Sequence, residues 1–86
     1  MGRFETAAEA MLGGPGEGAD VFIKLGMMYS TGGDVPADYV SAHKWFNIAA
    51  MRGSKDAIRL RREIAELMSE SEISAAQRAA RAWLAR

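Results

Sequence analysis

Cysteine is absent from the 86-residue sequence, and histidine occurs only once, as His43. Without thiols the chain can form no disulfide framework and no cysteine zinc ribbon, and it has no thiol nucleophile. His43 has no second histidine or cysteine to help it hold a metal, and a zinc site needs three or four ligands. No serine has a base at a spacing that would activate it. We therefore expect no enzyme, no metal and no other cofactor, and we expect His43 to lie on the polar side of its helix.

Long apolar runs are also missing. The longest extend over only a few residues, whereas a membrane-spanning helix needs roughly 18 to 20. The first 14 residues carry Arg3, Glu5 and Glu9 where a secretory signal would have an apolar core. We therefore expect a cytoplasmic protein without a membrane span. Net charge is zero, with eleven cations and eleven anions, so the total charge favours no particular partner.

What the sequence does contain is helical periodicity. Hydrophobic residues make up 49% of the chain, and they recur at intervals of three and four positions, as an α-helix with one buried face requires. The first such segment, Arg3–Leu12, ends at a glycine cluster that we interpret as a flexible turn. The second covers Ala19–Thr31, with Gly26 in its middle. A mid-helix glycine costs about 1 kcal/mol relative to alanine, so Gly26 predicts the close approach of another helix.

Capping residues mark the remaining helices. Asp38 is placed to cap a third helix that ends at Gly53, and Ser54 to cap a fourth with an apolar stripe from Ala57 to Met68. Ser69 and Glu72 have the spacing of a capping box, which begins a fifth helix. We predict a single all-α domain of five short helices.

Residues of the second and third predicted helices resemble a known repeat. Leu25-Gly26-Met27-Met28-Tyr29, then Gly32, Val35-Pro36, Asp38, Ala42, Trp45-Phe46, Ala49-Ala50 and Gly53 match the Sel1-like repeat, a relative of the tetratricopeptide repeat, in order and spacing. The resemblance covers residues 19–53 and implies an antiparallel helical hairpin of the α-solenoid type. It assigns structural positions to Leu25, Gly26, Tyr29, Gly32, Ala42, Trp45, Ala49, Ala50 and Gly53.

The flanks are interpreted as caps on this one clear repeat. Residues 1–18 would form a capping helix and a glycine-rich loop, and residues 54–86 a degenerate capping hairpin, in which Arg61 and Arg62 stand where the family has Leu-Gly. The resemblance implies a scaffold that binds other proteins, such as an adaptor or assembly factor, and that has no chemistry of its own.

Three apolar residues depart from the repeat pattern. Phe22, Ile48 and Met51 occupy positions where the family usually has polar residues, so they are candidates for partner binding, together with Lys24 on the same helix as Phe22. The alternative is that neighbouring helices cover them. The sequence leaves this choice open.

Charge divides unevenly along the chain. Residues 1–43 hold two cations and six anions, and residues 44–86 hold nine cations and five anions. Such asymmetry suggests an alternative function, that of a regulator that binds nucleic acid phosphates through the basic stretch from Lys44 to Arg62. The candidate residues are Lys44, Arg52, Lys55, Arg59, Arg61 and Arg62. No aromatic residue lies among them to stack on a base, so we favour steering toward an acidic protein.

Overall fold

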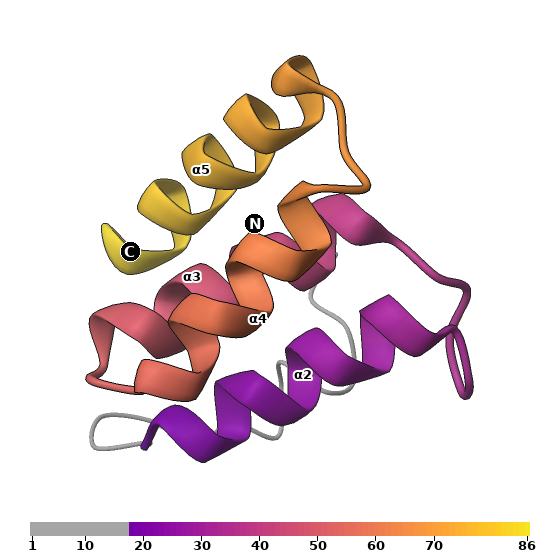
Figure 1. Ribbon diagram of the computed structural model, residues 1–86. Helices are drawn as coiled ribbons and strands as arrows, with labels where there is room; N and C mark the ends of the chain where they lie inside the picture. Colours follow the sequence, from indigo (N-terminus) through magenta and orange to yellow (C-terminus); the bar gives the residue numbers. More distant parts are fainter. Residues whose placement is uncertain (1–17) are drawn as a thin grey trace.

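The computed structural model describes residues 18–86, shown in colour in Figure 1. This part of the chain holds four α-helices: α2 (Ala19–Thr31), α3 (Tyr39–Met51), α4 (Lys55–Ala65) and α5 (Glu70–Leu84). It contains no strand, so the all-α prediction is confirmed for the described residues. The described residues contain four helices, whereas the sequence predicts five for the whole chain. The first predicted helix, Arg3–Leu12, lies outside the described residues.

The predicted caps begin three of the helices. The Asp38 carboxylate accepts a hydrogen bond from the backbone N–H of Ser41, three residues further on, and so begins α3. The Ser54 hydroxyl does the same at the start of α4. At α5, Ser69 and Glu72 each accept a hydrogen bond from the other's backbone N–H, which completes the capping box. Each cap satisfies a backbone donor that has no partner within its helix.

Glycines allow the chain to leave α2 and α3. Gly32 has a φ of 70° and Gly53 a φ of 101°, both in the left-handed region that only glycine adopts without strain. The N–H of Gly32 bonds back to the carbonyl of Met28, a common way to close a helix C-terminus. After this turn α3 runs back along α2, so the two helices form the antiparallel hairpin seen in Figure 1.

Gly26 is the point of closest approach within that hairpin. A Cβ atom at Gly26 would lie 2.9 Å from Cζ of Phe46 and closer still to Cδ1 and Cε1 of the same ring. Only glycine leaves room for the aromatic ring against the backbone of α2. The prediction that Gly26 marks a close helix contact is therefore confirmed.

α3 is the central helix of the described structure. It packs on α2, α4 and α5, whereas α4 and α5 make little contact with each other. In Figure 1, α4 crosses in front of α3, with α2 and α5 on either side. The segment 54–86 is therefore not the mutually packed capping hairpin that we predicted, since each of its helices packs on α3. As a consequence α3 is buried over most of its circumference, at Ala42, His43, Trp45, Phe46, Ile48 and Ala49.

Candidate interaction surfaces

Two of the predicted partner-binding residues belong to the core. Phe22 is 1% exposed, and Ile48 is fully buried. The Phe22 ring stacks on Trp45 at 6.0 Å between centroids, and the edge-on ring of Trp83, from α5, lies 5.3 Å away. The assignment of Phe22 and Ile48 to a docking surface is therefore wrong, because a partner cannot reach them. Of the other two candidates, Met51 is 64% exposed and Lys24 is also exposed.

Cations from the predicted phosphate-binding set cover this aromatic cluster. Lys44 places its Nζ 4.2 Å from the centroid of the Trp45 ring, and the Arg52 guanidinium lies 5.3 Å from the Phe22 ring. A cation over an aromatic face is attracted by the ring's electron density, and its stem shields the ring from water. Both residues therefore contribute to the packing of the domain.

Two further cations of that set have partners within the protein. Arg59 forms an ion pair with Glu63 one turn along α4, at 3.1 Å. Arg61 is half-buried and donates a hydrogen bond to the side-chain oxygen of Asn47 on α3. Four of the six candidates are thus engaged inside the described structure, which leaves Lys55 and Arg62. Two cations are few for a surface that follows a phosphate backbone.

His43 does not lie on the surface as predicted. Its side chain is 3% exposed, because helices that follow the predicted hairpin pack on α3 and cover the side that would otherwise face solvent. Its Nδ1 is buried without a hydrogen-bond partner among the described residues. Burial, and to a lesser extent the positive charge of Arg61, lower the pKa of His43 below its ordinary value of 6.5. The imidazole is therefore neutral at physiological pH.

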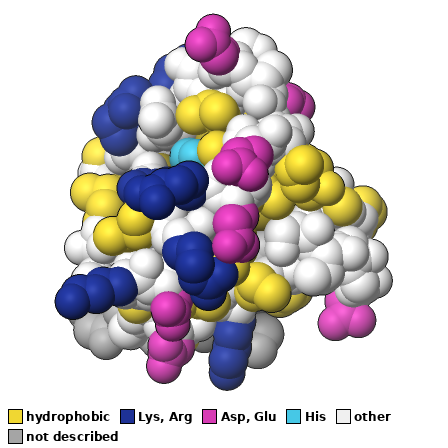
Figure 2. All heavy atoms as spheres, viewed as in Figure 1, with side chains coloured by type: hydrophobic (Ala, Val, Ile, Leu, Met, Phe, Trp, Pro, Cys, Tyr) yellow, Lys and Arg dark blue, Asp and Glu magenta, His cyan; other side chains and the backbone are white. Residues whose placement is uncertain are grey.

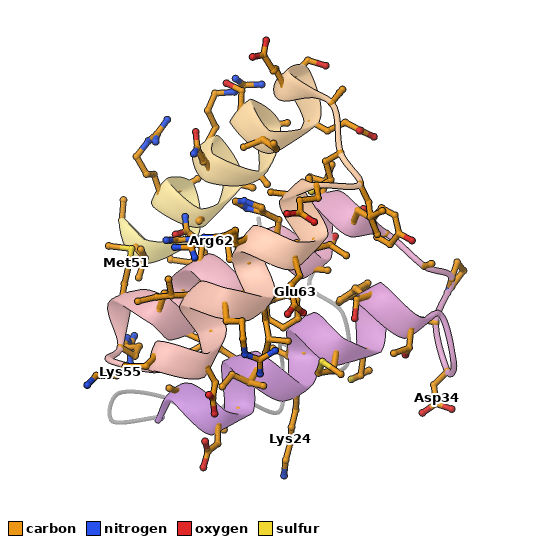
Figure 3. All side chains as sticks on the ribbon, in the orientation of Figure 1. Lys24, Asp34, Met51, Lys55, Arg62 and Glu63 are labelled. Atoms are coloured by element: carbon orange, nitrogen blue, oxygen red, sulfur yellow. The ribbon has the colours of Figure 1, made fainter. Side chains whose placement is uncertain are left out.

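An apolar groove runs between α2 and α4. Its volume is about 250 Å³. The ring of Phe46 is its floor, and Glu63 stands at its edge, between the two helices in Figure 3. Two large apolar side chains line it while facing solvent: Met27 on α2 is 41% exposed, and Leu67 after the end of α4 is 64% exposed. The remaining lining residues are Ser30, Leu60 and Ile64.

The sequence did not predict the exposure of Met27 or of Leu67. It placed Leu67 on the buried stripe of the fourth helix by continuing the helical period. In the structure α4 ends at Ala65, and Leu67 lies in the turn that follows, where that period no longer sets the direction of a side chain. Met27 and Met28 are adjacent on the same helix, and helical periodicity does not decide which of the two faces the core. The structure makes Met28 the partly buried one, packed against the core, and leaves Met27 in the groove.

A second hollow, of about 500 Å³, lies beside the start of α3 and the start of α5. Its lining includes Tyr29, Tyr39 and the two carboxylates of Asp38 and Glu72. Both carboxylates already accept hydrogen bonds from the backbone as helix caps. Helix capping therefore explains why the carboxylates of Asp38 and Glu72 lie at this hollow.

Among residues 18–86, no three histidine, cysteine or acidic side chains are grouped so that they could hold a metal ion. No helix in the same range is long and apolar enough to span a bilayer. Comparison with known proteins gives no match, whether to a family model, a curated protein or a solved structure.

Proposed function

We propose that the protein is a non-catalytic interaction module of the Sel1-like type, a cytoplasmic adaptor or assembly factor. It binds a helix or extended peptide of a larger protein in the groove between α2 and α4. The observation that carries this proposal is the exposure of Met27 and Leu67 on the two sides of an apolar groove. Single exposed apolar residues are ordinary, but two that line one concave surface are typical of a binding site.

The position of the groove supports the same proposal. In helical-repeat proteins the first helices of successive hairpins line the face that binds partners. Under the proposed resemblance α2 is the first helix of the repeat hairpin, and α2 forms one side of this groove. A partner's apolar side chain would contact Met27, Leu67 and the Phe46 ring, and the Arg59–Glu63 ion pair on α4 would lie at the polar rim.

The test compares partner binding and folding on the same variants. Leu67→Ser and Met27→Ser remove the exposed apolar groups, and Gln77→Ala is the matched control at an exposed position of α5. Truncating a true anchor costs about 2 kcal/mol, or about thirtyfold in affinity. Exposed substitutions shift stability by only about 0.5 kcal/mol. We expect proteins that co-purify with the wild type and with Gln77→Ala to be lost from both groove variants, at unchanged melting temperature.

Two results would contradict the proposal. Co-purifying proteins that stay bound to both groove variants would show that the groove is not the site. Tight binding to duplex DNA, weakening by about 0.9 log unit per phosphate contact for each log unit of salt, would support the nucleic acid alternative instead.

A further inference from the structure

A second exposed surface, distinct from the groove, extends from the end of α3 along one side of α4. It consists of Met51, Lys55, Ile58 and Arg62, which we call the basic face. Met51 is 64% exposed and Ile58 is 39% exposed. On α4, Ile58 follows Lys55 by three residues and precedes Arg62 by four, so the three side chains share one side of the helix. Figure 3 shows Met51, Lys55 and Arg62 on the same side of the molecule.

This face carries positive charge that the fold does not neutralise. From residue 51 to residue 62 the chain holds five cations and one anion. Arg59 and Arg61 have partners within the protein, but the side chains of Lys55 and Arg62 form no ion pair and no hydrogen bond within residues 18–86. Figure 2 shows lysine and arginine side chains gathered on this side, with hydrophobic ones between them. The structure therefore places two exposed apolar side chains, Met51 and Ile58, and two unpaired cations, Lys55 and Arg62, on this side of the molecule.

We infer that the basic face is a second docking site, and that it binds an acidic amphipathic helix of a partner protein. The apolar side of such a helix would cover Met51 and Ile58, and its carboxylates would pair with Lys55 and Arg62. Charge complementarity of this kind sets the rate and specificity of association, while burial of the two apolar side chains supplies affinity. The site goes beyond the groove proposed above, because it names a different surface and a different partner chemistry.

The same residues argue against the other anionic ligands. A nucleic acid strand is held by cations together with aromatic side chains that stack on bases, and the nearby aromatic residues Phe22 and Trp45 are each 1% exposed. A lipid surface requires a broad apolar stripe, and two side chains offer little area for insertion. An acidic amphipathic helix would contact both the apolar residues, Met51 and Ile58, and the cations of the basic face.

The probe is a synthetic peptide of about 20 residues, long enough to form a helix, with leucine at helical spacing and glutamate elsewhere. A matched peptide carries lysine in place of every glutamate. Fluorescence anisotropy measures the binding of each to the full chain. We expect the acidic peptide to bind and the basic one to show no binding. The double variant Lys55→Glu/Arg62→Glu should weaken acidic-peptide binding about tenfold or more, with a reduced dependence on salt.

Two controls locate the site and keep this inference separate from the groove. Lys24→Glu reverses an exposed charge on α2, away from the basic face, and should leave acidic-peptide binding unchanged. Met51→Ser should weaken it severalfold, whereas Leu67→Ser should not. Loss of binding on Leu67→Ser alone would place the peptide in the groove, which would overturn this inference and leave the proposed function intact. Equal binding of both peptides, or tighter binding to phosphatidylserine vesicles or duplex DNA, would also overturn it.

Discussion

Substitution of Gly26 by alanine tests the packing of the hairpin, because two physical effects oppose each other there. Alanine favours a helix over glycine by about 1 kcal/mol, so an exposed mid-helix glycine should gain stability from this change. Gly26 is buried, however, and the new methyl group would overlap the Phe46 ring at three of its carbon atoms. Carbon atoms in contact lie about 3.5 to 4.0 Å apart, so α2 and the ring must separate by about 1 Å.

The Phe46 ring is 2% exposed and packed in the core, so it can move away from the new methyl group only toward the groove that it lines. Overpacking of a core by a methyl group costs about 1 to 3 kcal/mol. After about 1 kcal/mol for the helix propensity of alanine is subtracted, Gly26→Ala should lower the free energy of unfolding by about 0 to 2 kcal/mol. The upper end of this range is a large share of the stability of so small a domain.

Urea unfolding followed by circular dichroism measures this change, with Gly33→Ala as the matched control. A Cβ atom at Gly33 meets only the Thr31 hydroxyl oxygen, at 4.0 Å, so that variant should be neutral or slightly stabilising. In the double variant Gly26→Ala/Phe46→Leu, the smaller side chain should relieve the overlap, so the two effects should be less than additive. A more stable Gly26→Ala protein, or strict additivity in the double variant, would refute the close contact of α2 and α3.

Further predictions follow from the core, the buried histidine and the caps. Phe22→Ala should lower the free energy of unfolding by about 3 to 5 kcal/mol, because the ring packs against two tryptophans. A melting temperature equal to that of the wild type would contradict the assignment of Phe22 to the core. Because burial lowers the pKa of His43, the unfolded chain takes up a proton below pH 6.5 that the folded protein does not. Stability should therefore be complete above pH 6.5 and should fall, by at most about 1.4 kcal/mol per pH unit, as the pH drops below that value. Urea titrations from about pH 5.5 to about pH 7.5 measure this dependence, and a His43→Gln variant that keeps it would assign it to other groups. Ser69→Ala removes one arm of the capping box of α5 and should cost about 1 kcal/mol in thermal unfolding; an unchanged midpoint would show that Glu72 alone holds the helix start.

The sequence predicts the parts of this fold that depend on local chemistry. Asp38, Ser54 and Ser69 cap helices because a short oxygen-bearing side chain can accept a bond from an N–H three residues away. Gly32 and Gly53 end helices because their backbone angles suit only glycine. These preferences act over four or five residues, so they can be recognised without knowledge of the rest of the chain.

The candidate site could not be predicted in the same way, because it depends on how distant helices pack. Periodicity shows that a helix has an apolar face, but not how many neighbours cover it. α3 has three neighbours, so His43 and Ile48 are buried although a two-helix hairpin would expose them. Arg61 lies where the repeat pattern has an apolar residue, and its bond to Asn47 requires α4 to lie against α3. The groove exists only because α2 and α4 stay apart over Phe46.

Photo-crosslinking from the groove tests the central claim most directly. A benzoylphenylalanine residue at position 67, in cells that produce the protein, should form a covalent adduct with a specific partner protein. The same residue at position 77 of α5, which is exposed but outside the groove, should not form it. Adding Met27→Ser on the opposite side of the groove should abolish the adduct while the protein remains folded. Identical adducts from positions 67 and 77, or an adduct that survives Met27→Ser, would contradict the assignment of the groove as the partner-binding site.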